Sequence, residues 1–325
     1  MHTIIGTDEA GYGPNYGPLV IAATRWEVPD DHADLRTQLK HVLCETKPNS
    51  EDSRIEITDS KRLYDGIHSL DRLERGVLSF CAQLFSVPST FSELLTLLSN
   101  KRFAGSETKV SRTAGFSELP LLDFELNLPF ALRPREIEAT SQSLQSGLRN
   151  SGIRLTGISI QCVFPKLFNR ILGDVGNKAN LLSTMTLGLV HHMLPAEGKT
   201  KICCDRHGGR LRYAGVIQHC LTDSYVKVVG ESPTRSVYRW QSTTQECELE
   251  FLVKGESQVP VALAAMVAKY VRELCMVAWN RFWISHLPGL KPTAGYPVDA
   301  RRFRTDIAEK QRELGIEENE IWRLK

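Results

Sequence analysis

The segment from Ile4 to Ala23 constrains the fold more than any other part of this sequence. Two apolar runs flank an acid pair and a turn rich in glycine and proline, in the letters IIGTDEAGYGPNYGPLVIAA. The runs predict two strands, with Asp8 and Glu9 at the end of the first. Adjacent carboxylates repel each other, so this pair indicates a bound cation or a reacting group. Mg²⁺ with a phosphate substrate is a common solution to such repulsion.

Composition and charge limit the class of protein. The chain has 325 residues, of which 42% are hydrophobic, and a formal net charge of +2, so global charge does not indicate a nucleic-acid binder. Its eight cysteines include no C-x-x-C pair, which predicts reduced thiols. The longest nearly apolar helical stretch, Val259 to Ala268, is shorter than the roughly 20 residues that a bilayer requires. We therefore expect a cytoplasmic protein with no membrane partner.

Periodicity along the chain predicts alternating strands and helices. Strands are expected at Ile158 to Val163 and Lys201 to Asp205, and helices at Asn177 to Leu194 and Gln258 to Leu274. We expect one catalytic domain over 1–325, with an insertion at about 87–132 and a C-terminal tail at about 288–325. A second, β-rich insertion is expected at about 211–250, where three β-like runs suggest an antiparallel hairpin: Tyr225 to Val229, Ser236 to Trp240 and Glu248 to Val253.

Six blocks of this sequence, in the same order, resemble the type 2 ribonuclease H family, which includes ribonuclease HII. Each block is weak alone, and their shared order is the specific signal. The blocks are Asp8 to Gly13 (D-E-A-G-x-G), Asp59 to Lys61 (D-S-K), Asn177 to Gly188 (a helix start with N-L-L), Cys204 to Gly208 (a strand ending in aspartate), Lys254 to Ser257 with Ala264 to Lys269 (K-G-D-S and A-S-I-x-A-K in the family), and Gly295 to Pro297 (G-Y-P).

The resemblance implies a fold and an activity. The fold is an α/β ribonuclease H-like domain with a central mixed five-stranded sheet flanked by helices, here with an inserted hairpin region and a C-terminal helical tail. The activity is that of an Mg²⁺- or Mn²⁺-dependent endonuclease, a hydrolase that cuts the RNA strand of RNA–DNA hybrids and leaves 3′-hydroxyl and 5′-phosphate ends. The implied partner is the hybrid, and no obligatory protein partner is evident.

Four carboxylates are the candidate catalytic and metal-binding residues. Two divalent cations about 3.5–4 Å apart can activate a water and stabilise the leaving oxygen of a phosphodiester. Holding such a pair requires carboxylates from separate segments, and we assign Asp8 as the bridging ligand with Glu9, Asp205 and Glu256. The family normally has aspartate where this chain has Glu256, so two acids of the predicted hairpin remain alternatives for the fourth ligand: Asp223 and Glu231.

The resemblance also implies residues that contact the substrate. In the family, the glycine-rich turn approaches the ribose 2′-hydroxyl, which distinguishes RNA from DNA. That turn usually reads G-R-G or G-K-G, whereas this chain has tyrosine between the glycines, so cleavage at a single embedded ribonucleotide is an open question. The candidate substrate-binding residues are Gly11, Tyr12, Gly13, Ser60, Lys61, Asn180, Arg206, Lys269 and Tyr296.

Three other functions compete with this interpretation. A metal nuclease acting on DNA would use the same carboxylates, and a non-catalytic hybrid-binding protein would keep the binding surface. A dinucleotide-binding enzyme is disfavoured because the acids precede the glycines and because Pro14 and Pro18 interrupt the helix that its motif requires.

Overall fold

One large sheet organises the molecule. The computed structural model describes residues 1–29, 34–46, 52–64, 70–99 and 125–324. Within them, seven strands form a single sheet in the order β5-β2-β1-β6-β9-β8-β7. The strands are β1 (His2–Ala10), β2 (Leu19–Val28), β5 (Arg154–Val163), β6 (Gly198–Asp205), β7 (Lys227–Glu231), β8 (Arg235–Gln241) and β9 (Gln245–Leu252). Two short strands, β3 (Leu43–Cys44) and β4 (Ile55–Glu56), pair separately. The predicted mixed α/β fold is confirmed.

Strand direction brings two chain segments together at one edge of the sheet, the one formed by the carboxyl ends of β1 and β6. β1 pairs in parallel with β6, which pairs in parallel with β9, whereas β2 runs antiparallel to β1. Thr7 of β1 is the register partner of Cys204 in β6. Because neighbouring parallel strands end at the same edge, Asp8 and Asp205 follow this pair on adjacent strands.

The sheet is larger than the five strands predicted from the sequence. The run predicted at Glu248 to Val253 falls largely in β9, which lies between β6 and β8 rather than apart from the sheet. β8 pairs antiparallel with β9, and β7 pairs antiparallel with β8. The two strands β7 and β8 therefore continue the central sheet beyond β9 through backbone pairing.

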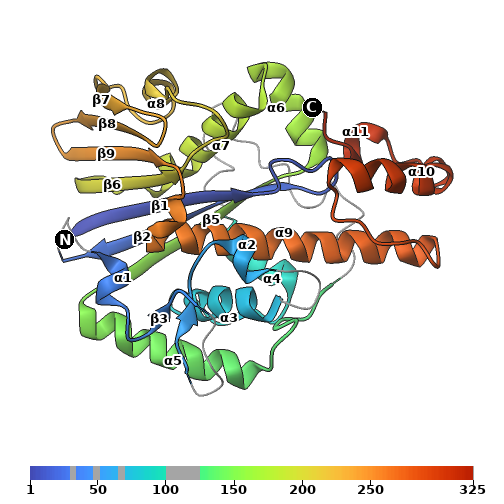
Figure 1. The fold of residues 1–325 in the computed structure, drawn as a ribbon, viewed down its shortest axis with the longest axis horizontal. Helices are drawn as coiled ribbons and strands as arrows, with labels where there is room; N and C mark the ends of the chain where they lie inside the picture. Colours follow the sequence, from blue (N-terminus) through green and yellow to red (C-terminus); the bar gives the residue numbers. More distant parts are fainter. Residues whose placement is uncertain (30–33, 47–51, 65–69, 100–124, 325) are drawn as a thin grey trace.

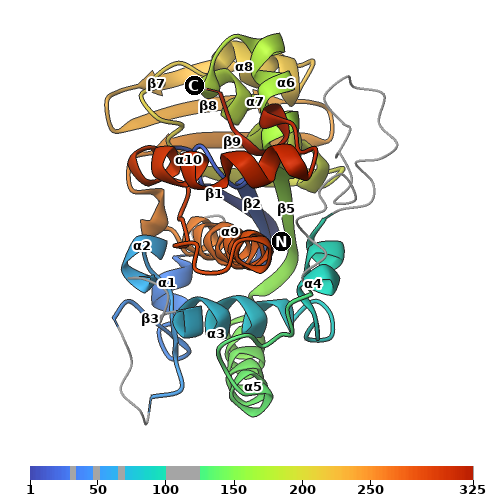
Figure 2. The ribbon, with the colours of Figure 1, turned by 90° about the vertical axis from the view of Figure 1, so that its right-hand side faces the viewer.

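Helices cover the two faces of the sheet (Figures 1 and 2). On one face lie α9 (Val259–His286), which packs against β1 and β2, and beyond it α3 (Leu70–Cys81) and α5 (Pro134–Ser151). The other face carries α6 (Pro165–Val175), α7 (Lys178–Met193) and α8 (Ala214–Cys220). Shorter helices are α1 (Leu35–Gln38), α2 (Ser60–Leu63) and α4 (Phe91–Leu98). No described helix is long and apolar enough to cross a bilayer.

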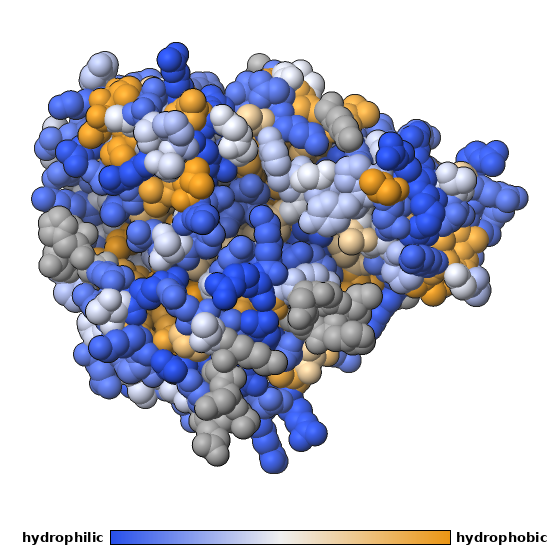
Figure 3. Space-filling view, viewed as in Figure 1, coloured by the Kyte–Doolittle hydropathy of each residue, from blue (hydrophilic) through white to orange (hydrophobic). Residues whose placement is uncertain are grey.

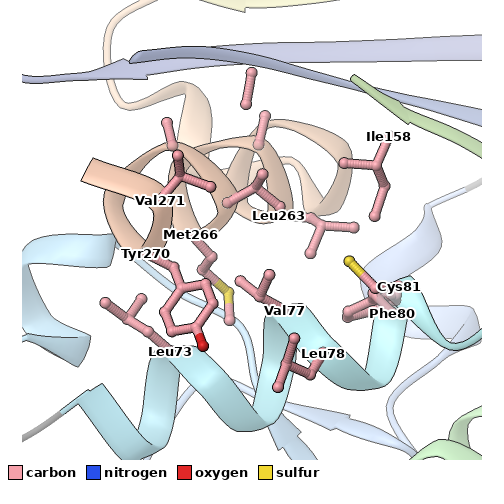
Figure 4. Close-up of a cluster of buried hydrophobic side chains, with 14 of the residues drawn as sticks. Leu73, Val77, Leu78, Phe80, Cys81, Ile158, Leu263, Met266, Tyr270 and Val271 are labelled. Atoms are coloured by element: carbon pink, nitrogen blue, oxygen red, sulfur yellow. The ribbon is translucent and has the colours of Figure 1, made fainter. Parts of the chain in front are cut away.

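The apolar core has a layer on each face of the sheet. Val20 and Ala22 of β2 point into the layer under α9, and Leu19 and Ile21 point into the layer under α7. Burial on both faces explains why β2 reads as a continuous apolar run instead of an alternating one. Figure 4 shows part of the first layer, where Met266 of α9 lies beside Val77 of α3.

The remaining predicted segments are only partly described. Within the insertion expected at about 87–132, α4 is described and 100–124 lies outside the described residues. The C-terminal tail contains α10 (Pro297–Glu313) and α11 (Glu318–Ile321). Phe303 of α10 packs against Tyr16 of the glycine-rich turn, with ring centroids 5.5 Å apart. The tail therefore packs against the turn that follows the acid pair.

Candidate active site

The acid pair lies at the end of β1, as the sequence predicts. The backbone N–H of Glu9 donates to Asp8 Oδ1 at 2.6 Å. Burial raises the pKa of Asp8 well above its ordinary value, and the nearby carboxylates of Glu9, Asp205 and Glu256 raise it further. The four predicted carboxylates are thus close enough to influence the charge of a single group.

Asp205 is held by the turn that carries Glu256. It is the last residue of β6, and its Oδ1 accepts the backbone N–H of Gly255 at 3.0 Å. A Cβ atom on Gly255 would lie 3.1 Å from Asp205 Cα, which is tighter than ordinary packing allows. Lys254 precedes it with a φ of 62°, a left-handed conformation that costs a lysine about 1 kcal/mol. This turn places Glu256 beside Asp205.

Arg36 anchors the same turn, and the sequence analysis missed it. Its guanidinium donates to the carbonyl oxygen of Glu256 at 3.2 Å and to that of Ser257 at 3.3 Å. It also donates to the carbonyl oxygen of Ile57 at 3.1 Å, just before the D-S-K block. A single arginine in the four-residue helix α1 carries no motif, so no pattern in the sequence signals this role.

The electrostatics of the four acids favour a cation. Burial, and next the Asp205 carboxylate, raise the pKa of Glu9 to about 8, while Lys61 opposes this effect. Burial also raises the pKa of Asp205, and Glu256 contributes to that shift. Asp8, Glu9 and Asp205 therefore resist losing their protons while neighbouring carboxylates are charged, and a positive charge between the acids would relieve the repulsion.

The four carboxylates suit a divalent metal in their chemistry, although their side chains do not converge on one point. Among the described residues, no three side chains of His, Cys, Asp or Glu stand close enough together to hold a metal ion as they are placed. Four carboxylates nonetheless supply the oxygen ligands that Mg²⁺ and Mn²⁺ prefer. The residues thus fit the implied ions in their chemistry.

Several candidate substrate-binding residues surround the acids. Lys61, an exposed residue in α2, is near enough to lower the pKa of Glu9, and Ser60 begins the same helix. Tyr12 lies between Glu9, whose charge helps raise the phenol pKa after burial, and Gly208, where a Cβ would be 3.7 Å from the Tyr12 hydroxyl. Gly13, which directly follows Tyr12, is exposed.

Tyr296 and Gly11 are linked through α9. Tyr296 is 51% exposed and immediately precedes α10. The guanidinium of Arg272 lies 5.9 Å from the centroid of its ring. The same side chain fills the space beside Gly11, where a Cβ would lie 2.5 Å from Arg272 Nε. Gly11 also has a φ of +84°, so the position requires glycine for two reasons.

Three other candidates have partners within the protein. The Oδ1 of Asn180 accepts from Arg210 at 2.9 Å. Arg206 donates to the carbonyl oxygens of Ser232 and Pro233 in the turn between β7 and β8. The ammonium of Lys269 is 2.7 Å from Glu273, and 4.4 Å from the centroid of the Tyr64 ring.

The two alternative acids lie in the segment from α8 to β7. Glu231 ends β7, where its carboxylate accepts the Tyr238 hydroxyl at 2.5 Å and lies 3.8 Å from Arg212. Asp223 is exposed in the connection between α8 and β7. Glu256, in contrast, directly follows the residue that binds Asp205. This placement favours Glu256 as the fourth member of the cluster.

Comparison with known proteins gives structural likeness without sequence relatives. No protein-family model and no curated protein matches the chain. Among solved structures, the chain resembles ribonuclease H2 from Pyrococcus horikoshii OT3, with 14% identity, coverage of 98% of this chain and 92% of that one, and a TM-score of 0.40. Ribonuclease HII from Archaeoglobus fulgidus, solved with PCNA, matches at 12% identity, 99% and 96% coverage, and a TM-score of 0.38.

A third match is Bst-RNase HIII in complex with Mn²⁺. The identity is 14%, the coverage is 99% of this chain and 66% of that one, and the TM-score is 0.39. All three matches are to proteins described as ribonucleases H, and they extend over nearly the whole of this chain. Their TM-scores and identities are too low to carry an argument about function, which depends on the residues of this chain.

Proposed function

We propose that this protein is a divalent-metal-dependent endonuclease that hydrolyses the RNA strand of RNA–DNA hybrids and leaves 3′-hydroxyl and 5′-phosphate ends. One observation carries the proposal: acids from three separate segments gather where β1 and β6 end, since the turn that carries Glu256 donates a hydrogen bond to Asp205 and the charges of Glu9, Asp205 and Glu256 all raise the pKa of Asp8. Lys61 of the D-S-K block supplies a cation that is close enough to lower the pKa of Glu9.

Each residue of the cluster has a proposed task. Asp8, Glu9, Asp205 and Glu256 would hold two Mg²⁺ or Mn²⁺ ions, which supply charge stabilisation for an attacking water and a leaving oxygen when bound. Lys61 would contact a phosphate of the cleaved strand. The backbone of the Gly11 turn, with Tyr12 and Tyr296, would contact the sugars on either side of the scissile bond.

Two surface features bear on a nucleic-acid partner: the hydropathy of one face of the molecule and one exposed aromatic side chain. In Figure 3, hydrophilic residues cover most of the face shown, and hydrophobic residues form small separate patches. The exposed aromatic side chain of Tyr296 supplies a ring against which a sugar or base can pack. Such a mixture of charge and exposed aromatic groups is typical of nucleic-acid interfaces.

A parallel cleavage assay tests the proposal. Purified protein with Mg²⁺ or Mn²⁺ is incubated with three labelled substrates: an RNA–DNA hybrid, a DNA duplex with one embedded ribonucleotide, and an all-DNA duplex. We expect cleavage of the RNA strand of the hybrid, loss of cleavage with chelator, and products that a ligase can join through their 5′-phosphates.

The other outcomes separate the competing functions. Cleavage of the all-DNA duplex alone would identify a DNA nuclease on the same carboxylates. Binding of the hybrid with no product under either metal would identify a non-catalytic binding protein. The duplex with one ribonucleotide decides whether tyrosine between the two glycines permits cleavage at a single embedded site.

A further inference from the structure

Glu273, which is not one of the four candidate metal ligands, lies at the centre of a buried polar cluster on α9. Its side chain is almost entirely buried, and Oε1 is 2.7 Å from the ammonium of Lys269 and 3.1 Å from the guanidinium of Arg272. The Tyr64 hydroxyl also donates to this carboxylate, and burial together with the Glu273 charge raises the pKa of Tyr64. One carboxylate therefore binds three side chains.

Together these partners reach three candidate substrate-binding segments, and Tyr64 and Lys269 share the first of them. Tyr64 directly follows α2, the helix that begins with Ser60 and Lys61. Lys269 lies over the Tyr64 ring and so holds the same segment from a second side.

Arg272 makes the other two connections. Its Nη2 donates to the carbonyl oxygen of Ala294 at 2.9 Å, one residue before Gly295 and Tyr296. Its Nε occupies the space beside Gly11, where a Cβ atom would lie only 2.5 Å from it. Gly295 in turn accepts the backbone N–H of Asn15 at 2.8 Å, so the glycine-rich turn and the Tyr296 segment also bind each other.

Arg272 depends on Glu273 for its charge balance. The guanidinium is 1% exposed, and within the described part of the chain Glu273 is the acid at ion-pair distance from it. A buried charge that loses its partner is strongly destabilised in that position. Without the Glu273 charge, Arg272 would be expected to leave the site beside Gly11 and Ala294.

We propose that Glu273 is a positioning residue that holds the D-S-K turn, the Gly11 turn and the Tyr296 segment in one arrangement through Tyr64, Lys269 and Arg272. It does so without touching the substrate. The consequence for substrate binding rests on the proposed function, whereas the positioning itself does not.

The first test is hydrogen exchange of the free protein, which needs no substrate. Glu273→Gln keeps the shape of the side chain and removes its charge, and Tyr64→Phe removes a single hydroxyl. We expect Glu273→Gln to accelerate exchange about tenfold in residues 11–17, 59–64 and 293–297, with strands β1 and β6 unchanged. Tyr64→Phe should accelerate only 59–64. The exposed Glu138→Gln is the matched control and should change none of them.

The second test measures hybrid affinity and turnover for the same variants. Glu273→Gln should weaken binding about tenfold while kcat at saturating hybrid changes less than about threefold, because the acids that act in cleavage are untouched. Tyr64→Phe should show a smaller loss of affinity in the same direction.

Two results would overturn the positioning role: faster exchange confined to α9, or uniformly faster exchange that follows a lower unfolding temperature with unchanged affinity. If the wild-type protein neither binds nor cleaves the hybrid, the proposed function fails, and the exchange pattern still decides whether Glu273 positions the three segments.

Discussion

Two sets of acids in this molecule are removed from water, and they differ in how many hydrogen-bond donors surround their carboxylates. Glu74 in α3 is fully buried, and its carboxylate accepts three backbone N–H groups, from Phe130, Ala131 and Leu132, at 2.5–2.8 Å. It also accepts the Tyr270 hydroxyl at 2.6 Å. Among the described residues, the carboxylate of Asp8 at the end of β1 accepts a single hydrogen bond, from the N–H of its neighbour Glu9.

Glu250 of β9 sharpens the contrast because it lies in the same sheet as Asp205. Burial alone would raise the pKa of Glu250, but Lys201 and hydrogen bonds from Arg235 and Cys203 outweigh it, so the pKa lies below its ordinary value. The pKa values of Asp8, Glu9 and Asp205 are all raised. The chain can surround a buried acid with donors where the acid is structural, so the crowded edge indicates a partner supplied from outside the protein.

The largest expected difference between the two sets is catalytic. Asp8→Asn and Asp205→Asn should each reduce hybrid cleavage by about a thousandfold, equivalent to about 4 kcal/mol of transition-state stabilisation, because each removes a proposed metal ligand. Hybrid binding should persist, as measured by a gel-shift or anisotropy titration. Near-normal turnover by either variant would refute the metal assignment.

The structural acid should show the opposite pattern. Glu74→Gln exchanges an acceptor-only group for an amide that faces four donors, so we expect a loss of about 3 kcal/mol in the free energy of unfolding. Urea unfolding measures this loss, and Glu138→Gln, at an exposed position of α5, should change stability by less than about 0.5 kcal/mol. A Glu74→Gln protein of unchanged stability would remove the contrast between the two sets.

The fourth acid can be tested within the same comparison. Glu256→Gln should reduce turnover by about a hundredfold, or about 2.7 kcal/mol, since glutamate at this position follows the turn that binds Asp205. Asp223→Asn and Glu231→Gln are the matched variants and should retain turnover. Impairment of Asp223→Asn with normal Glu256→Gln activity would move the fourth ligand into the segment that precedes β7.

Much of this arrangement could be predicted from the sequence, because local pattern and topology coincide there. The apolar runs on both sides of the acid pair predict β1 and β2, and Asn177 predicts the start of α7, where its side chain accepts the backbone N–H of Asn180 at 2.8 Å. The convergence of Asp8 with Asp205 follows once β1 and β6 are parallel neighbours.

Other features depend on contacts that no local pattern encodes. The pairing of β8 with β9 joins the hairpin to the sheet through backbone hydrogen bonds, to which a sequence motif gives no clue. Arg36 reaches the Glu256 turn across 220 positions of sequence. The ion pair of Lys269 with Glu273 has the i,i+4 spacing that a helix brings together, but the contact of Lys269 with the Tyr64 ring joins two segments far apart in the sequence.

The smallest effect concerns pH and separates the two sets without substrate. Because the folded-state pKa of Glu9 is raised from 4.5 to about 8, the folded protein holds this proton more tightly than the unfolded chain does. The resulting stability is fully present below the unfolded pKa and is lost as pH rises through about 8. Metal-free protein should therefore lose about 1–2 kcal/mol between about pH 6 and about pH 8 in urea unfolding.

Glu9→Gln should flatten this dependence, and Mg²⁺ should stabilise the wild type more at the higher pH because metal binds the deprotonated carboxylates. The same pH dependence in wild type and Glu9→Gln, with no response to Mg²⁺, would mean that the acids at the ends of β1 and β6, like Glu74, need no cation from outside the protein.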